Sequence, residues 1–220
     1  LVLIGSPVVL CAYAYVGYPL LLALLAGRRR KQAAPVFADL PRVTITVPVY
    51  NEERNLSEVL EGLIAQDYPA DRRHILVISD ASTDRTDEIA RGYADRGVEL
   101  LRLPQRRGKT AAENAADRVV RGDIIVNTDA TVRLLPNALK TLVNAFVDPT
   151  VGVASGRDVS VGASASEANR GESGYVGYEM WVRRLETRFG SIVGASGCFY
   201  GTRRHLYDAP FPEGLSRDFA

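Results

Sequence analysis

Cysteine and histidine are scarce in this sequence, with two of each among its 220 residues. Cys11 lies in an apolar leader and Cys198 lies far from it, so neither a disulfide framework nor a cysteine-based zinc site is supported. His74 and His205 each stand alone, which argues against zinc chemistry. Two isolated thiols fit a reducing compartment.

An excess of charge of one sign is also lacking, because 27 basic residues face 26 acidic ones. The basic residues gather only at 28–31, and without that run 23 basic residues would face the same 26 acidic ones. A nucleic-acid-binding domain usually has a basic face, so we expect no nucleic acid partner. The contents of 46% hydrophobic and 24% charged residues are those of an ordinary folded domain with a real core.

Charge is absent from residues 1–27, which are mostly Leu, Val, Ala and Tyr. About 20 such residues form a helix that crosses the hydrocarbon core of a membrane. We therefore predict a transmembrane helix over 1–27 and a basic juxtamembrane linker over 28–42. Because the basic run comes after the apolar one, the positive-inside tendency places the residues beyond it on the cytoplasmic side of the inner or plasma membrane. A buried soluble helix and a truncated signal sequence are the alternatives.

Beyond residue 42, apolar strands alternate with amphipathic helices. Strands are predicted at 43–47, 75–78, 98–103 and 124–127, and helices begin near 56, 84, 110 and 136. Asn51 is a plausible cap of the first helix, and Gly97 a terminator of the second. This alternation predicts an α/β fold with a mainly parallel central sheet covered on both faces.

The pattern loosens after residue 151. Residues 160–174 are predicted to form a loop, and the aromatic, basic stretch 175–189 a helix. That helix fits an acceptor contact and a membrane surface equally well. The Gly- and Ser-rich stretch 190–201 is expected to run close to a ligand or to another part of the backbone.

Polar side chains come directly after the predicted strands, where ligands of parallel sheets collect. Asp80 and Asp84 could each cap a helix, and capping is the better explanation for Asp84. Asp129 comes after an apolar strand with no helix until about Pro136, so capping explains it poorly and a ligand or metal role is favoured. We expect Asp80 and Asp129 to protrude from adjacent strand tips into one shared cleft.

Two familiar phosphate-binding motifs are missing. Arg107-Gly108-Lys109-Thr110 follows a strand and opens a helix, but a P-loop needs glycine at the position of Leu103. No G-x-G-x-x-G follows any predicted strand, so a dinucleotide-binding turn is not indicated.

Four motifs together resemble the family 2 glycosyltransferases. They are Pro48-Val49-Tyr50-Asn51-Glu52, Asp80-Ala81-Ser82-Thr83-Asp84, Arg107-Gly108-Lys109 with Asn114, and Asp129-Ala130-Thr131. Their joint order and spacing are specific, although no single motif is. The leader and Arg217-Asp218-Phe219 look like the membrane-bound polysaccharide synthases of that family. The resemblance covers residues 43–220 and implies a GT-A fold, a nucleotide-binding α/β domain.

The resemblance also implies roles for individual residues. The nucleotide-sugar would be bound by Pro48, Tyr50, Glu52, Asp80, Lys109, Asn114 and Asp129. Within that set, Asp80 would accept a hydrogen bond from the base, commonly uracil, and Lys109 would lie near the pyrophosphate. Asp129 and Thr131 would hold a divalent Mg²⁺ or Mn²⁺ ion. Glu52 is explained equally well as an acid that the helix dipole favours.

The implied reaction is inverting transfer of a hexosyl or N-acetylhexosaminyl group from a UDP-sugar. The acceptor would be a glycan or a lipid at the cytoplasmic membrane face. Asp218 matches the late acid that removes the proton from the acceptor hydroxyl. Because the sequence stops two residues later, we expect a C-terminally truncated part of a longer enzyme.

Three positions depart from the family pattern. Thr131 replaces the second acid of the metal motif, and Arg217 replaces the acid before the base, where it would lower the pKa of Asp218. Ala81 replaces the usual glycine, a mild change if the backbone there does not need a positive φ. The departures leave open a catalytically weak or inactive nucleotide-binding scaffold. A nucleotidyltransferase would use a similar crevice.

Overall fold

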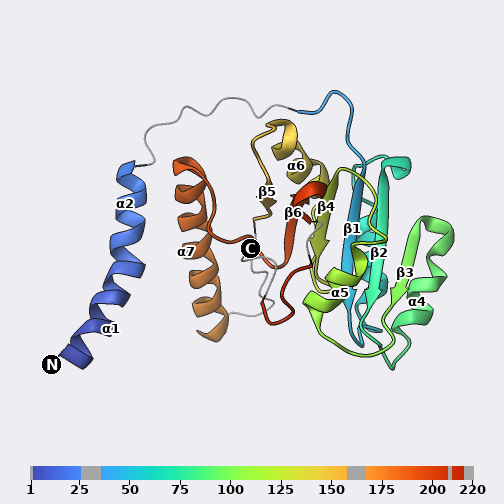
Figure 1. Cartoon of the computed structure of the whole chain (residues 1–220), viewed down its shortest axis with the longest axis horizontal. Coiled ribbons are helices and arrows are strands. Elements are labelled where there is room, and N and C mark those ends of the chain that lie inside the picture. Colours follow the sequence, from blue (N-terminus) through green and yellow to red (C-terminus); the bar gives the residue numbers. More distant parts are fainter. Residues whose placement is uncertain (1, 26–35, 158–166, 208–209, 216–220) are drawn as a thin grey trace. The chain divides into compact units, whose positions relative to one another are not determined.

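The computed structural model describes residues 2–25, 36–157, 167–207 and 210–215 (Figure 1). Contacts divide the chain into two compact units. The first comprises residues 1–33 and 157–194, and the second comprises 34–156 and 195–220. The grouping of residues 157–194 with the N-terminal helix is not anticipated by the sequence-based boundary at residue 43.

The second unit is built on a six-stranded sheet in the order β3-β2-β1-β4-β6-β5. Strands β1 to β4 are parallel to one another, whereas β6 is antiparallel to both β4 and β5. The predicted mainly parallel sheet is therefore confirmed. The strands are β1 (Val43–Val49), β2 (Arg73–Ser79), β3 (Val98–Arg102), β4 (Ile124–Thr128), β5 (Val153–Ser155) and β6 (Phe199–Arg203).

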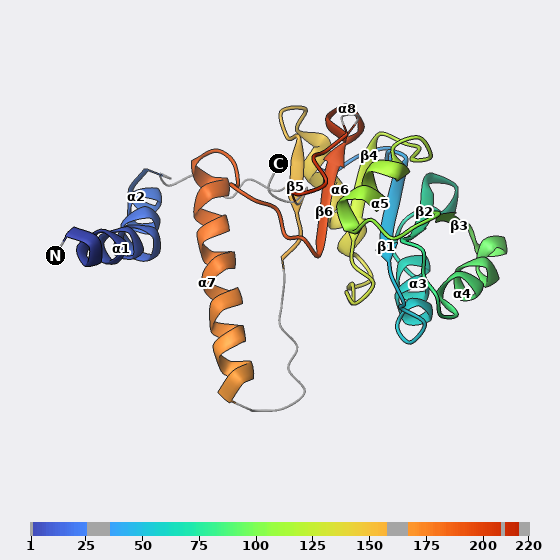
Figure 2. The same cartoon turned by 60° about the horizontal axis from the view of Figure 1, so that its bottom comes forward.

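Helices cover both faces of this sheet. Successive strand residues point to opposite faces, so each strand contributes apolar side chains to two separate cores. In β2, Ile75 and Val77 join the core beneath α3, α4 and α6, whereas Leu76 and Ile78 join the core beneath α5 and α8 (Figure 2). The α-helices are α3 (Leu56–Ile64), α4 (Thr86–Gly92), α5 (Lys109–Ala116), α6 (Ala138–Asn144) and α8 (Arg204–Tyr207). Short η segments lie at Ala70–Arg72, Ala94–Arg96 and Ala145–Val147.

Several predicted boundaries need correction. Asn51 does not cap α3, because the cap position is Asn55 and Asn51 has a left-handed φ of 55°. Helix α5 ends at Ala116 rather than near residue 120. The predicted loop at 160–174 is wrong from residue 167 onward, where a helix begins; residues 160–166 lie outside the described residues.

Strands β5 and β6 were not predicted. Residues 199–201, three of the five residues of β6, lie inside the Gly- and Ser-rich stretch, and this composition concealed the strand. Gly201 explains part of that composition, because a Cβ atom there would lie 3.2 Å from the Phe146 ring. The close approach expected for this stretch is therefore made by Gly201, which lies against the Phe146 side chain and pairs with the backbone of β4.

The first unit consists of an apolar N-terminal helix and α7 (Glu167–Phe189). The apolar helix runs through α1 (Val2–Ala12), a π-helical turn η1 (Tyr13–Gly17) and α2 (Tyr18–Leu25). Its Ser6–Leu25 stretch is long and apolar enough to cross a membrane, and it is the one such helix in the described part of the chain.

The turn before β4 yields a stability prediction. Gly122 has φ 104°, and a Cβ atom there would lie 2.6 Å from the Arg42 carbonyl oxygen. Gly122→Ala should therefore lower the free energy of unfolding by roughly 2 kcal/mol, measured by chemical denaturation in detergent. The matched control is Gly62→Ala inside α3, where a Cβ atom meets nothing within 4 Å. This control should be neutral or stabilising by up to about 1 kcal/mol, and equal effects of the two changes would contradict the prediction.

Candidate functional site

The predicted site residues gather where β1, β2 and β4 end. The register pairs Val49 of β1 with Ser79 of β2, so the segments after these strands start side by side. Asp80 and Asp129, however, do not lie after adjacent strands, because β1 lies between β2 and β4. The expectation of adjacent strand tips is therefore wrong. Both acids instead contact the chain at the start of α5.

Asp80 is held by backbone N–H groups. Its Oδ1 accepts a hydrogen bond from Arg107 N at 2.8 Å, and its Oδ2 accepts one from Gly108 N at 2.7 Å. Asp80 is only 5% exposed, so these two charge-assisted bonds compensate a nearly buried carboxylate. Gly108 adopts φ 93°, a conformation that favours glycine. Each carboxylate oxygen has a second lone pair with which to accept from a ligand.

Asp129 pairs with Lys109, the residue that follows Gly108 and begins α5. Lys109 Nζ lies 2.6 Å from Asp129 Oδ1 and 3.1 Å from the Gly197 carbonyl oxygen. The side chains of Lys109 and Asp129 are 41% and 33% exposed. An ion pair this open to water contributes at most about 1 kcal/mol, so a phosphate or a cation could displace either partner at little cost.

Tyr50 presents its ring to a cation. The Arg106 guanidinium carbon lies 3.8 Å from the Tyr50 ring centroid, within the range of a cation–π contact. Pro48 precedes it within β1, paired with Ile78 of β2. Arg106 was not among the predicted site residues, although the basic run 106–107 before Gly-Lys was a signal that could have identified it.

Glu52 has a local structural role. Its carbonyl accepts Leu56 N at 3.0 Å, which starts α3, and its Oε2 accepts Asn55 Nδ2 at 3.0 Å. Its own N–H donates to Thr86 Oγ1 at 2.8 Å. These bonds tie the segment after β1 to the beginning of α4.

The loops after β1 and β2 are bound to each other. Asn51 Oδ1 accepts Thr83 N at 2.8 Å, and Asp84 Oδ2 accepts Glu53 N at 3.1 Å. Asp84 Oδ1 also accepts Thr86 N at 3.0 Å, the first N–H of α4, although the cap position predicted for Asp84 is held by Arg85. Burial raises the pKa of Asp84, but the hydrogen bonds from Thr86 and Glu53 outweigh burial and hold its pKa below the ordinary value.

Side chains of α5 hold residues 211–215, the segment that precedes the predicted general base Asp218. Asn114 Nδ2 donates to the Phe211 carbonyl at 2.7 Å, and Phe211 N donates to Asn114 Oδ1 at 2.9 Å. Thr110 Oγ1 donates to the Leu215 carbonyl at 2.8 Å. The Asn114 carboxamide, which was predicted to bind the nucleotide, thus forms hydrogen bonds with the backbone of Phe211. The predicted base Asp218 and its neighbour Arg217 lie outside the described residues.

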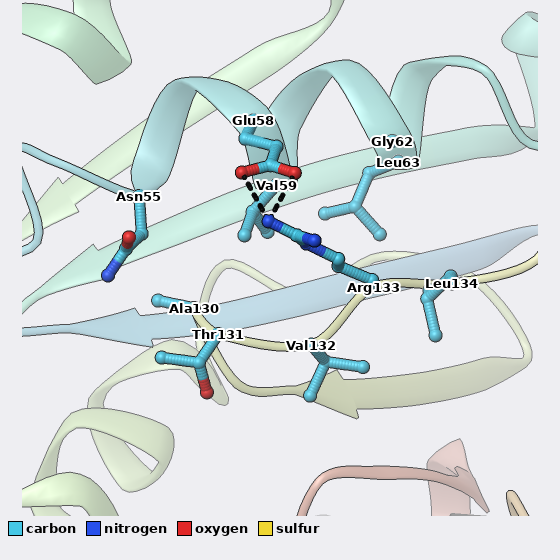
Figure 3. A pocket seen from close by; sticks show the side chains of 10 residues that line it. All are labelled: Asn55, Glu58, Val59, Gly62, Leu63, Ala130, Thr131, Val132, Arg133 and Leu134. Atoms are coloured by element: carbon cyan, nitrogen blue, oxygen red, sulfur yellow. Dashed lines mark hydrogen bonds and ion pairs between the residues drawn. The ribbon is translucent and has the colours of Figure 1, made fainter. Parts of the chain in front are cut away.

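Thr131 lines a pocket of about 300 Å³ between α3 and residues 130–134 (Figure 3). Val59 and Leu63 of α3 line its apolar wall, and Arg133 pairs with Glu58 at 3.0 Å. Within the described ranges, no three His, Cys, Asp or Glu side chains cluster as metal ligands.

Ala81 yields a prediction on the loop that carries Asp80. Its φ of 58° shows that the backbone does need a positive φ, so replacement of glycine here is not mild. Ala81→Gly should raise the free energy of unfolding by about 0.5–1 kcal/mol, because relief of left-handed strain exceeds the added entropy of the unfolded chain. Denaturant titration in detergent would measure this change.

Asn51 is the matched control for this prediction. It has the same kind of φ, 55°, but its side chain holds Thr83, so Asn51→Gly should not stabilise the protein. A loss of stability in Ala81→Gly would show that the conformation at residue 81 is unstrained.

Comparisons with known proteins point to one family. The model of Glycosyl transferase family 2 matches residues 44–209. An N-acetylglucosaminyltransferase of Bradyrhizobium diazoefficiens is 31% identical over 197 residues, which cover 82% of this chain and 39% of the relative. A beta-monoglucosyldiacylglycerol synthase of Synechocystis sp. is 26% identical over 173 residues, covering 77% of this chain and 36% of the relative. The chain thus spans less than half the length of these two relatives.

Solved structures show the same fold. The mannosyltransferase PcManGT from Pyrobaculum calidifontis, in complex with GDP-Man and Mn2+, superposes with a TM-score of 0.74 at 29% identity. The match covers 96% of this chain and 60% of that one. S. aureus TarS 1-349 in complex with UDP-GlcNAc matches with a TM-score of 0.50 at 25% identity, covering 57% and 37%. The fold is GT-A, and the chain belongs to glycosyl transferase family 2.

Proposed function

We propose that this chain is the donor-binding part of an inverting glycosyltransferase that uses a nucleotide-sugar, most simply a UDP-sugar. The observation that carries the proposal is the convergence of Asp80, Lys109 and Asp129 on the start of α5. This arrangement offers acceptors for a base and a cation for phosphate on one edge of the sheet. Relatives named N-acetylglucosaminyltransferase and neighbours holding GDP-Man or UDP-GlcNAc support it.

The nucleotide of the donor would be recognised at its base and at its diphosphate. Tyr50 offers a ring face for the base, and Asp80 offers oxygens that accept from the base N–H groups. Lys109 would turn from Asp129 to the diphosphate, because the phosphate oxygens attract its ammonium charge more strongly. Pro48 and Glu52 would shape the pocket, Pro48 within β1 and Glu52 through the bonds that fix the loop after it.

Asp129 and Thr131 would hold a Mg²⁺ or Mn²⁺ ion. One carboxylate and one hydroxyl suit a hard cation that takes its remaining oxygen ligands from water and a diphosphate. When bound, the ion would neutralise the charge that develops on the leaving diphosphate. The partial exposure of Asp129 leaves it accessible to such an ion.

Asp218 would act as the general base toward the acceptor hydroxyl. Attack on the face opposite the leaving group then inverts the anomeric carbon. Arg217 would lower the pKa of Asp218 and weaken it as a base, since the adjacent cation favours the carboxylate.

The acceptor would be a glycan or a lipid at the cytoplasmic face of the cell membrane. The apolar Ser6–Leu25 stretch supports membrane attachment, and the basic run at 28–31 supports a cytoplasmic orientation of the residues beyond it. The match to a glycolipid synthase fits this setting.

Thr131 and Arg217 favour one competing function, a nucleotide-binding scaffold without turnover. Isothermal titration with UDP and Mn²⁺ tests nucleotide binding, which both functions require, and a folded sample that binds no nucleotide would contradict both. A transfer assay with a UDP-sugar separates the two, because only the transferase forms product. A preference for nucleoside triphosphate over UDP would indicate a nucleotidyltransferase.

Asp129→Ala should abolish metal-dependent binding of UDP, because it removes the single carboxylate of the proposed cation site. Calorimetric titration with and without Mn²⁺ measures the loss. Asp67→Ala is the matched control, since Asp67 is also an exposed acid paired to a lysine, Lys140, at 3.0 Å. Unchanged affinity in Asp129→Ala would remove this residue from the site.

Asp218→Asn, made in the complete protein, should leave UDP binding intact and reduce the rate of transfer by at least about 100-fold, the usual contribution of general base catalysis. Product formation under saturating donor measures the rate, and calorimetry measures binding. Normal turnover by this variant would show that another group removes the proton.

A further inference from the structure

The chain that follows β6 runs back along α5, from the end of that helix to its start. At the far end, Arg204 of α8 pairs with Asp117, the residue directly after α5, at 3.0 Å. Tyr207 of α8 is 2% exposed and packs in the same apolar core as Ala112 and Ala116 of α5. The beginning of this run is therefore held against the second half of the helix.

Residues 211–215, here called the anchored segment, are bonded to side chains of α5. Asn114 Nδ2 donates to the Phe211 carbonyl at 2.7 Å, and Asn114 Oδ1 accepts Phe211 N at 2.9 Å. Thr110 Oγ1 donates to the Leu215 carbonyl at 2.8 Å. All three bonds end on backbone groups of the anchored segment, so they fix the path of the main chain itself.

The last of these bonds lies at the start of α5, beside the candidate site. Thr110 follows Lys109, whose ammonium group binds Asp129 at 2.6 Å. Asp218 comes three residues after Leu215, and three residues extend over at most roughly 11 Å. The covalent chain therefore keeps Asp218 within that distance of a residue bonded to the first turn of α5.

This bound is too loose for catalysis. A general base must lie within about 3 Å of the group whose proton it removes. Misplacement by about 1 Å can cost roughly 100-fold in rate. The covalent chain gives only a neighbourhood, whereas the bonds from Asn114 and Thr110 also fix the direction in which the anchored segment reaches the site.

We propose that Asn114 and Thr110 are positioning residues for the general base, and that Asn114 serves the base rather than the nucleotide. The donor and the acceptor of the Asn114 amide both bond Phe211, so that backbone sets the orientation of the amide. The inference rests on the proposed function, because it takes Asp218 as the base.

Asn114→Ala, made in the complete protein, should lower kcat about 10- to 100-fold and change the Kd for UDP by less than about twofold. The change releases the anchored segment but leaves Asp80, Lys109 and Asp129 in place. Initial rates at saturating UDP-sugar measure kcat, and calorimetry measures Kd. An unchanged kcat would overturn the proposal, and a weakened affinity for UDP would assign Asn114 to the nucleotide.

Thr110→Val is a milder variant, because valine keeps the branched shape and loses only the hydroxyl. It should lower kcat by about threefold to tenfold, as expected for one lost hydrogen bond. Thr141→Val is the matched control: Thr141 Oγ1 also donates to a carbonyl at 2.8 Å, that of Asn137 at the start of α6. This control should leave kcat unchanged, and equal rates for the two variants would remove Thr110 from the proposed role.

A double-mutant cycle with Asp218→Asn tests whether Asn114 acts through the base. Adding Asn114→Ala to Asp218→Asn should cost little further rate, because the positioning of a group that no longer takes the proton has no effect. Losses that multiply would show that Asn114 acts elsewhere and would overturn the inference while the base assignment stands. Normal turnover by Asp218→Asn alone would instead remove the base assignment of the proposed function, so the two failures are distinguishable.

Discussion

The beginning of α5 is the constraint on which the candidate site depends. Three consecutive residues bind two acids that come from non-adjacent strands: the N–H groups of Arg107 and Gly108 hold Asp80, and the Lys109 side chain holds Asp129. The Asp80 carboxylate is nearly buried, and breaking its compensation would cost several kcal/mol. The bond to Asp129 is exposed and weak. One half of the site is therefore rigid, and the other is free to exchange partners.

The same helix connects the donor side to the end of the chain. Thr110 and Asn114 are neighbours on one face of α5 and bind Leu215 and Phe211, and Arg107, just before the helix, binds Glu213. Asn114 bonds the backbone of Phe211 through both its amide atoms, as an adjacent strand would. Residues 211–215, which lead to Asp218, are thus fixed to the helix at whose start Asp80 and Asp129 are held.

The sequence was sufficient to predict the parallel strands, because period-two alternation and short apolar runs leave little ambiguity. It also located Asp80 and Asp129 directly after strands and Lys109 at the start of a helix. The order of the strands was not predictable in this way, since β1 pairs with both β2 and β4 across long crossovers. The partner of Asn114 lies 97 residues later, and no local pattern reports it. The left-handed φ of Ala81 escaped prediction because alanine gives no sign of it.

The Lys109–Asp129 pair bears on what Thr131 means for the family's metal motif. In the proposed site, where a hydroxyl takes the place of the second acid, a cation would compete with Lys109 for the Asp129 carboxylate. A diphosphate offers Lys109 a stronger anionic partner and offers the cation further oxygens. Each would therefore favour binding of the other, and this coupling must be reciprocal. In that case the loss of the second acid makes cation binding depend on the donor, which is compatible with activity and need not indicate its absence.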